Sequence, residues 1–142
     1  MTETIVPDAS VLLKWAFNSP DEGDRDNAIL LLNAWIDGKV EIVLPKLWSF
    51  EVGNVVMLKN PNMAQEIMEI FIGYSFTELD MTQELCRETL GLMRKYHVSF
   101  YDAVYHAVAI LKKGILLTAD EAYCRNIRGI KNVVRLKDWK RI

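Results

Sequence analysis

The chain has 142 residues, of which 51% are hydrophobic, and a formal net charge of −2 at pH 7. This length and apolar content predict one compact domain over residues 1–142, while the slightly acidic balance excludes a protein that holds nucleic acid by bulk positive charge alone. The longest apolar run is far shorter than the roughly 18 residues of a membrane span, and the first residues show no secretory signal, so we expect a cytoplasmic protein without membrane contacts.

The first half of the chain alternates strand and helix patterns. The predicted elements are a strand at 4–8, helices at 10–17 and 24–36, a strand at 40–44, and helices at 45–60 and 63–72. A turn-rich loop at 18–23 separates the first two helices. Pro45 is expected to open its helix, and Asn62 is expected to be the N-cap of the last one.

The second half continues the alternation. The predicted elements are a weak strand at 76–79, helices at 83–95 and 100–112, a strand at 115–118, a short helix at 120–126 and a strand at 132–136. Thr82 is a predicted N-cap, and Ser99 with Asp102 matches a capping box. Interleaved strands and helices predict an α/β fold, a three-layer α/β/α sandwich with a mainly parallel central sheet.

Four acidic residues, Asp8, Glu51, Asp102 and Asp120, stand at or near the starts of predicted helices. At the carboxyl edge of a parallel sheet, residues at successive strand-to-helix junctions converge although they are far apart in sequence. Four carboxylates brought together repel one another and take up protons unless a cation neutralises them. Oxygen-rich clusters of this kind suit Mg²⁺ or Mn²⁺.

Each acid also has a purely structural explanation. Asp8 and Asp120 can act as N-caps, Asp102 can close its capping box, and Glu51 can be a solvated helix residue. These roles do not explain why an acid recurs at so many helix starts on one edge of the sheet, which favours a common site. Asn54, three residues after Glu51, shares its side of the helix and is expected to line the same cleft.

Four segments around these acids resemble the PIN-domain nucleases, most of all the VapC-type toxins. They are Val6–Ser10, Ser49–Asn54, Tyr101–Ala107 and Leu117–Asp120, and the resemblance extends from residue 5 to about residue 134. It implies a metal-dependent ribonuclease in which Asp8, Glu51, Asp102 and Asp120 hold one or two Mg²⁺ or Mn²⁺ ions, with Ser10 and Thr118 as supporting hydroxyls.

One position departs from the family pattern. Many members carry a further acid shortly after the residue matched by Asp120, but here Tyr123 occupies that region and only Glu121 is acidic nearby. We therefore expect Asp8, Asp102 and Asp120 to form the inner shell of one metal. Glu51 acts through a water or binds a second ion.

Several other residues invite a functional interpretation. His106 is interpreted as a packed helix histidine rather than a proton donor, and Trp15, Trp35 and Trp48 as core. Trp139 is the one aromatic residue to test for base stacking. It lies in a segment, residues 125–141, with seven basic residues and one acid, where a phosphate backbone could dock, although solvated surface charge explains the same pattern.

The predicted function is an endoribonuclease acting on single-stranded or loop RNA. The resemblance to VapC-type toxins implies an antitoxin protein partner and a homodimer. Three alternatives remain at this point: an RNA-processing nuclease outside any toxin system, a non-catalytic binding module, and a phosphoryl-transfer domain with Asp8 as nucleophile. The last requires a lysine near the acids, whereas Lys112 and Lys113 fall at a helix end.

Overall fold

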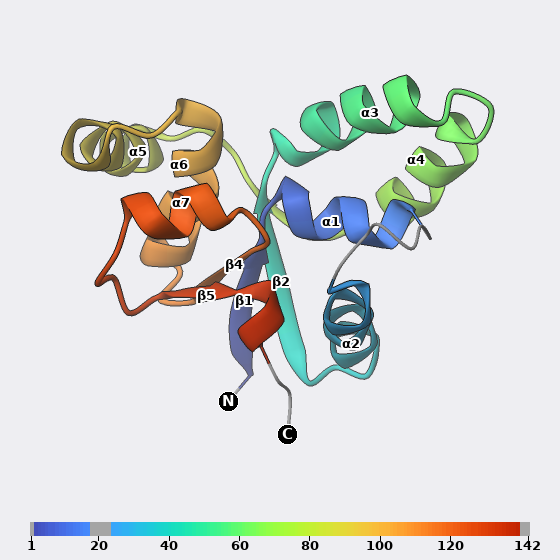
Figure 1. The fold of residues 1–142 in the computed structure, drawn as a ribbon, viewed down its shortest axis with the longest axis horizontal. Helices are drawn as coiled ribbons and strands as arrows, with labels where there is room; N and C mark the ends of the chain where they lie inside the picture. Colours follow the sequence, from blue (N-terminus) through green and yellow to red (C-terminus); the bar gives the residue numbers. More distant parts are fainter. Residues whose placement is uncertain (1, 18–23, 140–142) are drawn as a thin grey trace.

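A five-stranded parallel sheet runs through the centre of the fold, with strand order β3-β2-β1-β4-β5 (Figure 1). The computed structural model describes residues 2–17 and 24–139. The strands are β1 (Glu3–Pro7), β2 (Val40–Pro45), β3 (Thr77–Leu79), β4 (Ile115–Thr118) and β5 (Val133–Arg135). Every neighbouring pair is parallel, so the carboxyl ends of all five strands meet at one edge.

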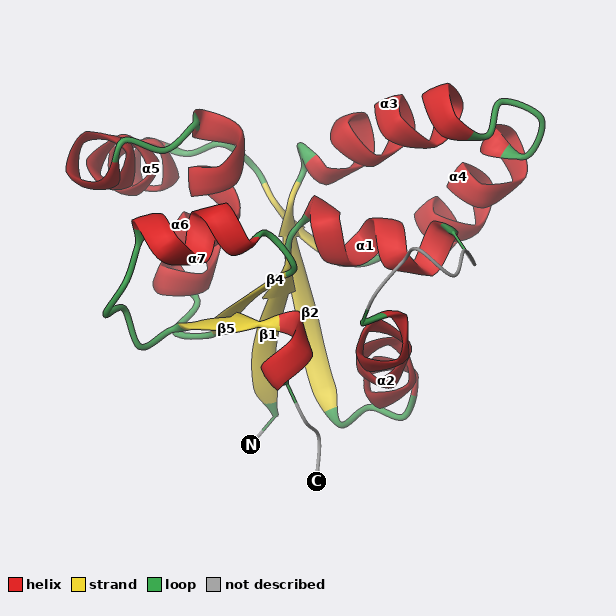
Figure 2. Ribbon diagram, viewed as in Figure 1, coloured by secondary structure: helices red, strands yellow, loops and turns green. Residues whose placement is uncertain are grey.

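Helices cover both faces of this sheet, as Figure 2 shows. They are α1 (Ala9–Ala16), α2 (Arg25–Ile36), α3 (Trp48–Lys59), α4 (Ala64–Gly73), α5 (Gln83–Tyr96), α6 (Phe100–Leu111) and α7 (Glu121–Asn126), with a 3₁₀ turn η1 (Leu136–Asp138) near the end. Helices α1 to α4 lie on one side and α5 to α7 on the other (Figure 1). The predicted three-layer α/β sandwich is confirmed.

Two predicted helix starts are wrong. Pro45 ends β2, opposite Leu79 in the parallel register, because a residue without an N–H is tolerated at a strand end. Helix α3 begins three residues later. Asn62 does not cap α4: the Met63 N–H donates to the Asn60 carbonyl at 3.1 Å, so a hydrogen-bonded turn precedes the helix, and α4 begins at Ala64 without a side-chain cap.

The other two predicted caps form as expected. The Thr82 hydroxyl accepts a hydrogen bond from the Leu85 N–H at 3.1 Å. The Ser99 hydroxyl accepts one from the Asp102 N–H at 3.2 Å, which fixes the first turn of α6. The loop predicted at 18–23 lies outside the described residues.

The core contains the two central strands and an aromatic cluster. Ile5, Val6, Leu116 and Leu117 are almost completely buried, as expected for strands covered on both faces. The rings of Trp15, Trp35 and Trp48 all pack around Phe76, which confirms the three predicted core tryptophans.

Trp139 is also core, so it is not available to stack on a base. It is only 5% exposed and follows the fully buried Leu136. The Asn27 side chain donates a hydrogen bond to the Leu136 carbonyl at 2.9 Å, so contact with α2 holds this turn inward. Among the described residues, no helix has both the length and the apolar character needed to cross a membrane.

Candidate acidic site

Asp8 stands directly after β1 and is the N-cap of α1. Its Oδ1 accepts hydrogen bonds from the Ser10 N–H, at 3.0 Å, and from the Ser10 hydroxyl. The Ser10 hydroxyl oxygen in turn accepts one from the Ala119 N–H at 2.9 Å and lies 3.5 Å from the Thr118 hydroxyl oxygen. The two predicted supporting hydroxyls therefore join the carboxyl ends of β1 and β4.

Asp120 lies two residues beyond β4 and is the N-cap of α7. Its Oδ1 accepts a hydrogen bond from the Tyr123 N–H at 3.1 Å. Its own N–H donates to the Thr118 hydroxyl at 3.0 Å. Thr118 thus contacts both Ser10 and Asp120, and it fixes the position of the second acid relative to the first.

Glu51 and Asp102 occupy the first turns of α3 and α6, on opposite faces of the sheet. Both side chains approach the same edge because α3 follows β2 directly and α6 runs back to the start of β4. The Glu51 Oε1 and the Tyr105 hydroxyl are buried, and neither makes a hydrogen bond of normal geometry within the described residues. A buried carboxylate oxygen without a donor is costly, and a cation or its water would compensate for it.

The electrostatics show that the four acids share one environment. Burial raises the pKa of Asp8 to about 6, and the charge of Asp102 adds to the rise. Burial and then the charge of Asp120 raise the pKa of Asp102. Burial also raises the pKa of Glu51, where the nearby Tyr105 hydroxyl opposes the rise and Asp102 adds to it. Asp102 therefore makes Asp8 and Glu51 harder to ionise, and Asp120 does the same to Asp102.

The acids do not form a closed set of metal ligands. Within residues 2–17 and 24–139, no three Asp, Glu, His or Cys side chains are close enough to bind a single ion as they stand. The donor chemistry still fits a hard divalent cation, because every group is a carboxylate and the site contains one unpaired carboxylate oxygen. Asn54 is exposed on α3, and the role proposed for it stays a prediction.

Tyr123, at the position of the missing further acid, belongs to a buried hydrogen-bonded network. Its hydroxyl lies 2.7 Å from His106 Nδ1, and His106 Nε2 lies 3.3 Å from the Asn132 side-chain oxygen. An amide oxygen only accepts, so Nε2 carries the hydrogen and Nδ1 accepts from Tyr123. Burial lowers the pKa of His106, which keeps it neutral and confirms it as a packed helix histidine.

Glu121 does not take the place of the missing acid. Its carboxylate is exposed and forms ion pairs with Arg135, at 3.6 Å, and with Lys137, at 3.5 Å. These contacts direct Glu121 toward β5 and the 3₁₀ turn.

Two aromatic residues beside the acids were not identified from the sequence. Phe50 immediately precedes Glu51 and is 74% exposed, and Tyr101 immediately precedes Asp102 and is 57% exposed. Both line one largely apolar pocket of about 240 Å³ with Met81. The available signal was an aromatic residue directly before each of two acids.

Comparison with known proteins gives one family and a consistent fold. The family model of the PIN domain matches residues 5–128. No curated protein sequence gives a significant match.

Several solved structures resemble this fold. A toxin-antitoxin complex from Klebsiella pneumoniae has a TM-score of 0.70 and 19% identity, covering 93% of this chain and 97% of that one. PAE2754 from Pyrobaculum aerophilum has a TM-score of 0.68 and 21% identity, covering 96% and 93%. VapC20 of Mycobacterium tuberculosis, a toxin that cleaves the sarcin-ricin loop, has a TM-score of 0.62 and 16% identity, covering 81% and 87%.

Proposed function

The chain belongs to the PIN domain family, and we propose that it is a single-domain, metal-dependent endoribonuclease. The family is one of nucleases. The observation that supports the proposal is that Asp8, Glu51, Asp102 and Asp120 stand at one sheet edge, where burial raises the pKa of the first three and the charge of Asp102 acts on Asp8 and Glu51 and that of Asp120 on Asp102. A protein that gathers carboxylates at such a cost gains from it when a cation binds there.

We assign Mg²⁺ or Mn²⁺ as the cation. Asp8, Asp102 and Asp120 would hold it, with Glu51 binding directly or through a water. A divalent ion bound there supplies a nucleophilic hydroxide, neutralises charge on the phosphate oxygens and stabilises the leaving alkoxide.

The chain's own contribution is to hold the carboxylates in place. Ser10 fixes Asp8 Oδ1, and Thr118 fixes the backbone of Asp120. The Asp8 carboxylate also caps the start of α1, where the free N–H groups favour the ionised form that a metal requires. Asp8, Glu51 and Asp120 are partly buried, which strengthens the charge interactions that they make.

The pocket lined by Phe50 and Tyr101, which we call the aromatic pocket, supports an assignment of the substrate class. The exposed rings of Phe50 and Tyr101 stand next to Glu51 and Asp102, and unpaired bases stack on such rings regardless of sequence. Bases in a duplex are already stacked and do not reach these rings. This supports single-stranded or loop RNA as the substrate.

Cleavage of defined oligonucleotides tests the proposal. RNA and DNA strands of one sequence are incubated with the protein in Mn²⁺, Mg²⁺ or EDTA. We expect RNA cleavage with either metal and none in EDTA, and loss of cleavage in Asp8→Asn. Glu51→Gln should also lose activity, whereas Glu66→Gln is the matched control, because Glu66 stands in the first turn of α4 but is exposed. Equal cleavage by Asp8→Asn and the wild type would refute the assignment.

We further propose that this nuclease is the toxin of a toxin-antitoxin pair and works in the cytoplasm as a homodimer. The Klebsiella structure is such a complex. Exposed apolar residues on the helices of one face supply surface for protein contacts: Ile36, Met57, Leu58, Met63, Ile70 and Ile72. Co-purification with the product of the adjacent reading frame, and inhibition of cleavage by it, tests the antitoxin. Light scattering tests the dimer.

A non-catalytic binding module with the same fold is the second candidate. The observation in its favour is that no three ligand side chains within the described residues are already at metal-binding spacing. Calorimetric titration with Mn²⁺ separates the two, since a catalytic site must bind the ion and a binding module need not.

A further inference from the structure

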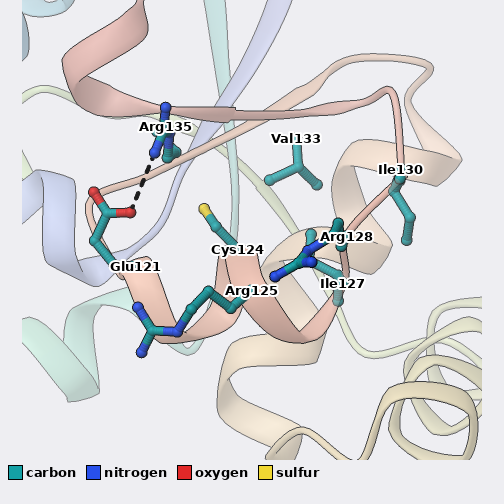
Figure 3. A pocket seen from close by; sticks show the side chains of 9 residues that line it. Glu121, Cys124, Arg125, Ile127, Arg128, Ile130, Val133 and Arg135 are labelled. Atoms are coloured by element: carbon teal, nitrogen blue, oxygen red, sulfur yellow. Dashed lines mark ion pairs between the residues drawn. The ribbon is translucent and has the colours of Figure 1, made fainter.

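A pocket of about 360 Å³ lies between α7 and β5, outside the acidic site (Figure 3). We call it the arginine pocket, because Arg125, Arg128 and Arg135 line it. Figure 3 shows the Cys124 thiol and the Val133 side chain directed into the space between helix and strand. Its volume is within the range of sites that hold small organic groups.

Only part of its positive charge is neutralised within the protein. Arg135 pairs with Asp138 at 2.7 Å and with Glu121 at 3.6 Å. Arg125 and Arg128 are exposed, and neither forms an ion pair with any described residue. Two guanidinium groups therefore remain available at the rim, each able to bind a phosphate through two parallel hydrogen bonds.

The arginine pocket and the acidic site share helix α7. Asp120 caps this helix, and Arg125 follows five residues later, about 7.5 Å along the helix axis at 1.5 Å per residue. The Cys124 thiol lies in the fields of both regions: burial raises its pKa, Glu121 adds to the rise and Arg135 opposes it, and Asp8 and Asp120 also contribute. A chain crossing the acidic site would reach the pocket within a few nucleotides.

We propose that the arginine pocket binds a phosphate-bearing nucleotide of the RNA substrate beside the cleaved bond. Arg125 and Arg128 hold the phosphate. The apolar side chains of Ile127, Ile130 and Val133 accommodate the sugar or the base. The inference rests on the proposed function for the identity of the substrate, and it adds a site that positions the strand across the acids.

An acidic protein segment is the competing ligand, since it would also pair with arginine. The apolar lining favours a nucleotide, because Ile127, Ile130 and Val133 can contact a sugar or a base, whereas an acidic segment offers them mainly charged side chains. Free inorganic phosphate is a second source of the same chemistry, and the experiment includes it as a separate arm.

The salt dependence of RNA binding tests the proposal. Binding of a fluorescent single-stranded RNA is measured by anisotropy in the Asp8→Asn background, with and without Arg125→Ala/Arg128→Ala. We expect about tenfold weaker binding, and a slope of log affinity against log salt that is smaller by about 0.7, because one phosphate of the single strand is no longer neutralised. An unchanged slope overturns the proposal.

A matched control removes the same charge elsewhere. Arg94→Ala/Lys112→Ala changes two exposed basic residues that lie on α5 and beyond the end of α6. This variant should keep the wild-type slope. An equal loss in both double variants would mean that net charge alone controls binding, which overturns the pocket.

Protection of Cys124 supplies a second measurement that leaves the pocket intact. In a Cys86→Ser background, where Cys124 is the one remaining thiol, saturating RNA should slow alkylation of Cys124 at least fivefold, and inorganic phosphate should do so only at millimolar concentration. No protection by RNA, or protection only by an acidic peptide, overturns the proposal.

RNA cleavage by the wild type, measured separately with Mn²⁺, tests the proposed ribonuclease function independently of the arginine pocket. Cleavage with an unchanged salt slope overturns the pocket alone. A reduced slope without any cleavage supports the pocket and overturns the proposed function.

Discussion

The Tyr123 hydroxyl lies 2.7 Å from His106 Nδ1, and this buried pair connects the helices that carry Asp120 and Asp102. The Tyr123 N–H also donates to Asp120 Oδ1. His106 stands one turn after Asp102 on α6. Tyr123 occupies the position where many family members carry a further acid. Through these two contacts it fixes the positions of Asp120 and Asp102 relative to each other.

Tyr123→Phe should destabilise the fold by about 1–3 kcal/mol, because it leaves the buried Nδ1 of His106 without a donor. Urea unfolding at pH 7.5 measures the loss. Tyr101→Phe is the control, since Tyr101 is 57% exposed and its ring is kept. Equal stability of Tyr123→Phe and the wild type would show that the His106 contact carries no net energy.

Asp8→Asn should stabilise the metal-free protein at neutral pH. The folded-state pKa of Asp8 is about 6, above the ordinary value of 3.8, so the folded chain holds this proton more tightly than the unfolded chain. The wild type therefore loses stability as pH rises from about 4 to about 6, by about 3 kcal/mol in total. Asparagine keeps the hydrogen-bond acceptor and removes the titration.

Urea unfolding in EDTA at pH 4 and pH 7.5 measures this effect. The two proteins should be similar at pH 4, and the variant should be more stable at pH 7.5. Asp24→Asn is the control, because Asp24 is exposed and makes no side-chain cap hydrogen bond. A variant that is less stable than the wild type at both pH values would contradict the argument.

The sequence correctly predicted structural elements that depend on neighbouring residues. Its predictions failed where contacts between residues far apart in the chain determine the structure. The Ser99 and Thr82 caps, the buried strands β1 and β4, and the acids at helix starts are all set by neighbouring residues. Trp139 was chosen for a test of base stacking because it lies among basic residues, but a hydrogen bond from Asn27 to the Leu136 carbonyl holds that turn against α2.

The same limit applies to the site. The position of Asp120 beside Asp8 depends on Ser10 and Thr118, which are 108 residues apart, and only the assembled sheet brings them together. The family resemblance supplied the order of the acids. Neither the resemblance nor the local pattern indicated that Arg125 and Arg128 line a pocket, because spacing along α7 does not reveal that β5 forms its opposite wall.

Divalent cations should stabilise the wild type in a pH-dependent way. Mn²⁺ at 100 times its dissociation constant adds about 2.7 kcal/mol to the unfolding free energy. The pKa values of Asp8, Glu51 and Asp102 are all raised, so protons compete with the metal as pH falls. We expect a higher melting temperature with Mn²⁺ at pH 7.5 and almost no shift at pH 4.5. Asp8→Asn should show no shift at either pH, whereas Glu66→Gln should behave as the wild type.

Gly114→Ala should destabilise the sheet. A Cβ at this position would stand 2.5 Å from the Thr4 carbonyl oxygen, which is backbone and cannot rotate away. The change should cost about 1–3 kcal/mol, the usual cost of overpacking. Gly73→Ala is the matched control, since nothing lies within 4 Å of its added Cβ. Thermal unfolding compares the two, and equal melting temperatures would show that β1 shifts to accept the methyl group.

Removing the aromatic pocket should weaken binding of single strands more than binding of duplexes. Stacking of one base on one ring contributes about 1–3 kcal/mol. Phe50→Ala and Tyr101→Ala, each in the Asp8→Asn background, should therefore weaken single-stranded RNA binding by about tenfold or more, with little effect on a hairpin stem.

Leu58→Ala is the control, because Leu58 is 75% exposed on the same helix as Phe50 but does not line the pocket. Anisotropy titrations at several salt concentrations measure all three. The salt slope should stay unchanged in these variants, since no phosphate contact is lost, and this distinguishes the aromatic pocket from the arginine pocket. Equal weakening of stem and single strand would mean that the rings support the fold rather than the bases.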